Sequence, residues 1–276
     1  MITENSKLSS KLIVYGILIL TSLTMIIPFV WMLLTAFMTL SESTAVNPFV
    51  IIPAEWRLEN FVDIIEAHDF VSLYGVTVAM IIGRVIAAVL TATLAGYAFA
   101  RINFFGKNVL FVLVLLQMMV PVQVFIIPQF QMVSSLEQLD TMFSLLFPGL
   151  VTAFGTFLMR QAYKGLPRDL EEASILDGCN TGQTFLFIMA PLVKSSMVAL
   201  GIFTAIFAYR ELMWPMIAQN RVMPLSGALA RMQGTHFVHF PRLMAAAFLA
   251  CIPMIVIYLI FQRHFVEGIA ASGSKL

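Results

Sequence analysis

The chain has 276 residues, of which 60% are hydrophobic and only 11% are charged. Soluble domains carry about 25% charged residues, so this composition excludes an ordinary soluble protein and indicates an integral membrane protein. The net charge of +1 argues against nucleic acid as a partner, which would call for a basic patch. Cys179 and Cys251 are too few for a disulfide scaffold and lack the spacing of metal ligands.

Lys7 and Lys11 precede the first apolar run, as in a signal peptide, but this run is too long for a cleavable core and lacks a clear cleavage site. It therefore predicts a first transmembrane helix. Since a span needs about 20 mostly apolar residues, we expect an all-α membrane protein with a single transmembrane domain over residues 1–276. Its six predicted spans are about 12–38, 71–99, 108–132, 142–162, 184–214 and 241–263.

Basic residues near the span ends predict the orientation, because short cytoplasmic loops are rich in Lys and Arg. One side collects Lys7, Lys11, Arg101, Lys107, Arg160, Lys164, Arg168, Arg263 and Lys275. The opposite loop 39–70 is mainly acidic and contains an expected short helix, 60–67, and the next opposite loop has Glu137 and Asp140 without a cation. The last opposite loop is less clear, because it holds Arg221 and Arg231. We expect both termini and the segment 167–191 in the cytoplasm.

The segment 167–191 is the longest polar stretch between the predicted spans. Asp169 precedes Glu172 by the spacing of a helix cap and its third helical residue, which predicts a short helix starting there. Gly178 can end that helix, and Asn180 or Thr181 can cap a second one. Two short helices hinged at a glycine suit a groove on a cytoplasmic partner.

The pattern Glu172-Ala173-Ser174, Gly178, Ile188 and Pro191 resembles the E-A-A-x-x-x-G-x9-I-x-L-P loop of binding-protein-dependent ABC importer permeases. Ser174 stands in place of the second alanine and Ala190 in place of the leucine. The resemblance implies a type I ABC importer transmembrane fold in which this loop couples to a separate ATPase. The ATPase-coupling residues would be Glu171, Glu172, Ala173, Asp177, Gly178, Ile188 and Pro191.

Other segments resemble the smaller permease subunit of maltose-type carbohydrate importers. They are residues 53–61 of the first outer loop, the stretch 96–106 at the end of span two, 224–234 in the last outer loop, and the C-terminal tail 264–276. In that family residues 224–234 would contact the substrate-binding protein, and the tail would reach toward the ATPase pair.

Several polar side chains inside the spans are candidates for the substrate pathway or a gate. An unpaired Arg84 would cost several kcal/mol in the membrane, so it should face a carboxylate, a partner subunit or a wet cavity. Pro121 and Pro128 should bend span three, which carries Gln117 and Gln123. Either glutamine could line the pathway or only bond to a neighbouring helix.

Span five ends in Tyr209-Arg210-Glu211-Leu212-Met213-Trp214-Pro215, where sugar importers commonly have W-N-x-F-x-W-P. Trp214-Pro215 matches that pattern, while Tyr209 and Arg210 depart from it. Tyr209 and Trp214 are candidates for the substrate pathway, because sugar sites favour aromatic faces. Arg210 and Glu211 are adjacent and need not pair with each other. They are therefore candidates for contact with an anionic ligand, or for an outer gate or an intersubunit ion pair.

The hypothesis from these patterns is a permease subunit, not an enzyme, in a prokaryotic cell membrane. It would import a di- or oligosaccharide or a glycoside by alternating access. Its expected partners are ABC ATPase subunits, a second permease, an extracytoplasmic substrate-binding protein and membrane lipid. The chain has no phosphate-binding loop and no metal motif beyond His236 and His239, so it would bind no cofactor, and ATP and Mg would act on the ATPase.

Three alternatives accompany this hypothesis. The first keeps the importer and changes the ligand to a charged sugar derivative, such as a uronate, a sialyl compound or a phosphorylated polyol. The second is a passive channel or a secondary transporter, which would leave the coupling loop without a purpose. The third is a membrane-embedded enzyme, for which no nucleophile–base or paired-aspartate pattern is found in the spans.

Overall fold

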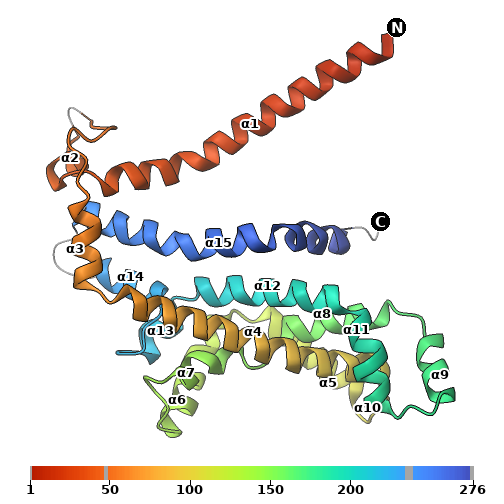
Figure 1. Cartoon of the computed structure of the whole chain (residues 1–276). Coiled ribbons are helices and arrows are strands. Elements are labelled where there is room, and N and C mark those ends of the chain that lie inside the picture. Colours follow the sequence, from red (N-terminus) through yellow and green to blue (C-terminus); the bar gives the residue numbers. More distant parts are fainter. Residues whose placement is uncertain (1, 47–48, 234–238, 274–276) are drawn as a thin grey trace. The chain divides into compact units, whose positions relative to one another are not determined.

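Apolar runs in this chain form helices, because a helix satisfies its backbone N–H and C=O groups internally where no water is available. The computed structural model describes residues 2–46, 49–233 and 239–273, and the side chains within 10–46, 49–233 and 239–260 and of residue 262. Three stretches are each long and apolar enough to cross a membrane (Figure 1). They are Ser10–Ala36 of α1 (Ile2–Ala36), α4 (Phe70–Arg101) and Phe240–Ile260 of α15 (Phe240–Gly273).

Three bent pairs of helices are each long and apolar enough, when the two members are taken together, to form one further span. The first joins α5 (Lys107–Met119) to η1 (Val122–Phe125) and α6 (Ile126–Ser135) with a bend of 104°. The second joins α7 (Met142–Leu146) and η2 (Phe147–Gly149) to α8 (Ala153–Lys164) with a bend of 47°. The third joins α10 (Thr181–Gln183), the π-helical η3 (Thr184–Met189) and α11 (Ala190–Leu192) to α12 (Lys194–Arg210) with a bend of 73°.

Only one of the two prolines expected to bend span three does so. Pro121 lies in the break between α5 and η1, in extended conformation with ψ of 131°. Pro128 is the third residue of α6. Its missing N–H costs nothing there, because the first N–H groups of a helix have no intrahelical acceptor.

The chain divides into two compact units, of which the first comprises Met1–Phe70 and Arg231–Val256. In this unit every side chain of α1 from Ser10 to Trp31 is exposed, as a lipid-facing helix requires. The outer segment holds α2 (Leu40–Thr44) and α3 (Glu59–Ala67). The Asn60 amide donates to the carbonyls of Ala36 and Met38, both at 2.9 Å, and so caps the end of α1.

The second unit comprises Val71–Ala230 and Ile257–Leu276. It includes α9 (Asp169–Leu176), α13 (Met213–Ala218) and most of α14 (Leu225–Gln233). Helices α4 and α8 approach closely at Gly96, where a Cβ atom would lie 2.6 Å from the Cβ of Met159 and 2.8 Å from the backbone nitrogen of Arg160. Glycine is required at this crossing, because a side chain would drive the two backbones apart.

Candidate functional site

The inner face of α9 is anchored to the ends of two spans. Glu171 forms an ion pair of 3.4 Å with Arg101, the last residue of α4. The same guanidinium donates to the carbonyls of Tyr163 and Leu166, both at 2.6 Å, at the end of α8 and in the turn beyond it. Arg101 therefore ties α9 to α4 and α8 through one side chain.

A second contact joins α9 to the helix that follows. The buried hydroxyl groups of Ser174 and Thr184 lie 2.8 Å apart, and Ser174 Oγ also lies 2.7 Å from the carbonyl of Glu171. Thr184 begins η3, which packs through Phe185, Ile188 and Met189 on the core of the unit. A hydroxyl at residue 174 thus makes a bond that an alanine could not.

The outer face of α9 has no partner within the described chain. It exposes a surface of apolar and acidic side chains, with Leu176 89% and Ile175 65% exposed. We call this surface the α9 face; its members are Leu170, Glu172, Ala173, Ile175, Leu176 and Asp177. Exposed apolar side chains grouped in this way mark an interaction surface.

The turn after α9 has the geometry expected of a glycine hinge. Gly178 has φ of +83°, in the left-handed region that other residues avoid. Asn180 then caps the next helix, since its side chain accepts from the Gln183 N–H while the Gln183 side chain accepts from the Asn180 N–H, each at 2.9 Å. Ile188 is half-buried and Pro191, in α11, is exposed.

The predicted capping role of Asp169 is wrong. The residue before the helix is Arg168, whose backbone is already helical and whose side chain caps nothing. Its carbonyl accepts the N–H groups of Glu171 at 2.9 Å and Glu172 at 3.2 Å, so the amides that a cap would serve are already satisfied.

Arg84 is paired inside the unit rather than left for a ligand. The side chain is buried, and its guanidinium lies 2.5 Å from a carboxylate oxygen of Glu211 while Nε donates to the Leu145 carbonyl at 2.7 Å. Gly149 makes room for it, because a Cβ at that residue would lie 2.7 Å from the arginine chain. The arginine therefore joins α4 to α7 and to the residue that follows α12.

Trp214 is also buried, and it does not line an open pathway. Its indole N–H donates to the Ser144 carbonyl at 2.7 Å, and its ring packs against Val133 and Ala218. Gln219 donates to the hydroxyl of Ser144 and, at 3.1 Å, to the Thr141 carbonyl. These contacts hold α13 against α7.

The remaining pathway candidates do not converge. Gln117, on α5, and Gln123, in η1, are both exposed on opposite sides of the bend in span three. Tyr209 is half-buried and packs beside Met80, Ile81, Leu145 and Ala208. The Arg210 side chain is exposed at the end of α12, next to the Arg84–Glu211 pair.

Asp140 has a structural role that the sequence analysis missed. One carboxylate oxygen accepts the backbone N–H groups of Asn220 at 2.8 Å, Arg221 at 2.7 Å and Val222 at 3.1 Å. Burial by itself raises the pKa of Asp140, but these three donors outweigh it and hold that pKa below its usual value. The residue itself has a left-handed backbone, with φ of +57°.

Parts of three segments named in the sequence analysis lie outside the described residues. These are His236 of the His236/His239 pair, Gly234 of the stretch 224–234, and the side chains of the tail 264–276. In the part of the chain that the structure describes, no three His, Cys, Asp or Glu side chains gather as metal ligands would.

Residues 88–270 match the family described as "Binding-protein-dependent transport system inner membrane component". The chain is 30% identical over 81% of both sequences to the arabinooligosaccharides transport system permease protein AraQ of Halalkalibacterium halodurans. It is 31% identical to the sn-glycerol-3-phosphate transport system permease protein UgpE of Escherichia coli, over 74% of this chain and 72% of that protein. In fold it is similar to a chain of a bacterial ABC transporter that imports the acidic polysaccharide alginate, with a TM-score of 0.77, 19% identity and coverage of 94% and 98%.

Proposed function

The chain belongs to the family of binding-protein-dependent transport system inner membrane components, and from this membership we propose that it imports a carbohydrate. It is a membrane-embedded transport subunit, not an enzyme, and its fold is that of the type I ABC importer permeases. Such a subunit works with an ATPase and a substrate-binding protein. Family membership decides against a passive channel or a secondary transporter, neither of which uses an ATPase.

The observation that carries the mechanism is that α9 is anchored to the protein on its inner face only. Its outer face is free for a partner, whereas its inner face is joined to α4 and α8 through Arg101 and to η3 through Ser174 and Thr184. In the proposed mechanism, closure of the ATPase dimer around ATP and Mg moves the α9 face. The buried contacts then transmit that motion to spans two, four and five. The transport cavity between the spans would thereby switch from inward-facing to outward-facing.

The finer assembly is part of the same proposal. Within the second unit, α9 lies at one end and α6 and α7 lie at the opposite end (Figure 1). Arg101 and Glu171 pair at the α9 end, and Lys107, Arg160, Lys164 and Arg168 belong to the helix ends and turns around that pair, whereas Glu137 and Asp140 lie in the turn between α6 and α7. By the distribution of basic residues, α9 and both termini face the cytoplasm. A second permease subunit would complete the pathway, because a single set of six spans brings Gln117, Gln123 and Arg210 to no common cavity.

Glu172→Lys tests the coupling role of the α9 face. Glu172 is exposed and makes no ion pair among the described residues, so the variant should insert and fold normally while reversing one charge on the face. We expect a loss of ATPase co-purification by roughly tenfold or more, as for a charge reversal within an interface. Glu66→Lys, an exposed charge reversal on α3, is the matched control. Equal ATPase recovery from both variants would contradict the assignment.

The ligand is a di- or oligosaccharide in the main proposal and a charged sugar derivative in the alternative. AraQ belongs to a system for arabinooligosaccharides, whereas the UgpE and alginate systems transport charged compounds. The exposed guanidinium of Arg210 favours the alternative, because it lies at the end of α12 and forms no ion pair among the described residues.

Arg210→Gln separates these two ligand classes. If the ligand is anionic, uptake of that ligand should fall by about tenfold or more, since a charged hydrogen bond contributes about 1.5–3 kcal/mol. Uptake of a neutral oligosaccharide should be unchanged. Arg221→Gln, an exposed arginine elsewhere in the unit, serves as the control. An equal loss for neutral and anionic ligands would exclude a charge-reading role for Arg210.

A further inference from the structure

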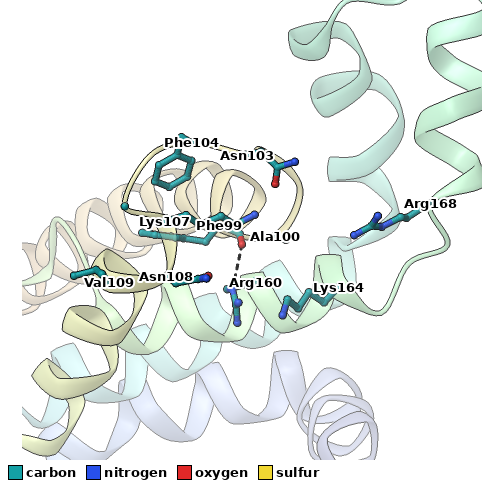
Figure 2. A pocket seen from close by; sticks show the side chains of 11 residues that line it. Phe99, Ala100, Asn103, Phe104, Lys107, Asn108, Val109, Arg160, Lys164 and Arg168 are labelled. Atoms are coloured by element: carbon teal, nitrogen blue, oxygen red, sulfur yellow. Dashed lines mark hydrogen bonds between the residues drawn. The ribbon is translucent and has the colours of Figure 1, made fainter.

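A basic pocket lies at the end of the second unit where α4, α5 and α8 come together. It has a volume of about 510 Å³ and is lined by the last turn of α4, the turn 103–106, the first turn of α5, and α8 with the residues after it (Figure 2). Four of the lining side chains are cations, namely Lys107, Arg160, Lys164 and Arg168, and none is a carboxylate. The coupling contacts described above use none of these four side chains.

The charges of the four cations are not neutralised within the described chain. Ion pairs recorded there involve other basic residues, and no carboxylate lies within 4.0 Å of any of these four. Lys107 donates to the Ile102 carbonyl at 2.7 Å. Arg160 donates through Nε to the Phe99 carbonyl at 3.2 Å, a bond drawn in Figure 2, and its guanidinium lies 3.7 Å from the Phe111 ring centre. Both side chains are therefore held in place while keeping their charge.

The start of α5 adds positive potential to this pocket. Gly106 precedes the helix in a left-handed conformation, and no side chain caps the helix. Asn108 and Val109 line the pocket, and their N–H groups are among those at a helix start that have no intrahelical acceptor. The helix dipole adds a partial positive charge at the same point.

The tendency of cytoplasmic loops to be basic explains the sign of these charges but not their grouping. Orientation in the membrane requires only that cations lie on one side. Here two segments distant in the sequence, residues 99–109 with Lys107 and residues 160–168 with the other three cations, bring four cations around one pocket. Mutual repulsion of unpaired cations costs free energy, which a bound anion would offset.

We propose that this pocket binds the phosphate of an anionic phospholipid headgroup. Its outer wall continues into the lipid-facing surface of α5, where Val109 is 66% and Leu113 55% exposed, and Phe105 beside it is fully exposed. Acyl chains can lie along that apolar surface while the phosphate occupies the pocket. Basic pockets between spans at the cytoplasmic side are suited to such headgroups. The site rests on the proposed orientation and extends the proposed function with a specific lipid partner.

Lipid retention in the assembled transporter tests the proposal. The full complex is reconstituted in phosphatidylcholine nanodiscs containing phosphatidylglycerol, and bound phosphatidylglycerol is counted by native mass spectrometry. Lys107→Gln with Lys164→Gln should weaken its binding by roughly fivefold for each lysine removed. The matched control is Lys11→Gln with Lys194→Gln, two exposed lysines outside the pocket, and it should retain the lipid as the unmodified chain does.

Three results would overturn the proposal. Equal lipid retention by the pocket variant and the control would show that the four cations form no site. Displacement of the lipid by millimolar inorganic phosphate would identify a free anion as the ligand. Binding to the isolated chain but not to the complex would mean that an acidic segment of a partner fills the pocket. The same spectra record the bound ATPase, so a failure of the proposed function would be seen separately as a complex that does not assemble.

Discussion

At the scale of single residues, the Arg84–Glu211 pair changes the interpretation of the intramembrane charges. Each residue alone was a candidate for substrate contact, but together they neutralise one another at 2.5 Å. The Arg84 side chain is 6% exposed and that of Glu211 is 26% exposed, so desolvation makes either charge costly without the other. Of the three candidate charges Arg84, Arg210 and Glu211, only that of Arg210 stays available to a ligand.

Removing one member of this pair should destabilise the protein more than removing both. We expect Glu211→Gln to cost about 3 kcal/mol, which lowers Tm by on the order of 10 °C, because Arg84 stays buried with an uncompensated charge. The double variant Arg84→Met with Glu211→Gln should cost less than Glu211→Gln alone and less than the sum of Glu211→Gln and Arg84→Met. Thermal unfolding in detergent is measured for the unmodified chain and these three variants. Strict additivity would mean that the two charges are independent.

Protonation of Asp140 should make the stability of the turn 220–222 depend on pH. Its folded-state pKa lies below the unfolded value of about 3.9, so its stabilisation is fully present above that value and is lost as pH falls through the folded pKa. Hydrogen exchange of the Asn220–Val222 amides, corrected for intrinsic rates, should therefore show constant protection from about pH 8 to 5 and a loss below about pH 4.

The matched variants at this turn are Asp140→Asn and Glu137→Gln. Both residues have positive φ, but only the Asp140 carboxylate is recorded as accepting backbone N–H groups. We expect Asp140→Asn to lower the protection of these amides by about 2 kcal/mol, the usual value of bonds to a charged acceptor. Glu137→Gln should leave it unchanged, and a similar loss in both would point to backbone strain instead.

At the scale of helices, the crossing of α4 and α8 is where the proposed mechanism would pass motion of α9 into the membrane. Arg101 at the end of α4 holds α9, and Gly96, five residues earlier, lets α4 lie directly against α8. We expect this close contact to couple the movements of the two helices.

Gly96→Val should therefore disturb both packing and coupling. The added side chain would overlap Met159 and the Arg160 backbone, and backbone atoms cannot move aside as a flexible side chain can. Overpacking of this kind costs about 1–3 kcal/mol. We expect a lower Tm and a lower transport rate per ATP hydrolysed. Gly75→Val, on the same helix with nothing within 4 Å of its Cβ, is the control and should be close to neutral.

At the scale of the whole molecule, the proposed orientation predicts which residues a reagent outside the cell can reach. In a Cys179→Ser, Cys251→Ser background, Glu66→Cys should react with an impermeant maleimide added to intact cells, because α3 is proposed to lie outside. Glu172→Cys should react only after the cell membrane is permeabilised. Both positions are exposed, so access to them depends on the side of the membrane rather than on burial. Reaction of both in intact cells would contradict the proposed topology.

The sequence by itself determined the membrane class, the long apolar helices and the glycine turn of the segment 167–191. Both the helices and the turn depend on local properties of the sequence. The long helices follow from the length of the apolar runs, and the turn follows from Gly178, which has no Cβ and adopts φ of +83°. The same local reasoning failed at Asp169, where a one-residue shift of the helix start removed the cap, and at Pro128, which lies in the first turn of α6.

Tertiary structure alone decided which side chains meet. Arg84 and Glu211 pair across two spans, Trp214 donates to Ser144 in another, and Asp140 holds the turn 220–222. No local pattern specifies these contacts, because each one joins helices or turns that are distant in the sequence and depends on how they pack. The basic pocket also depends on tertiary structure. The distribution of charge along the sequence predicts on which side of the membrane each cation lies, but only the packing of α4, α5 and α8 brings the cations around one pocket.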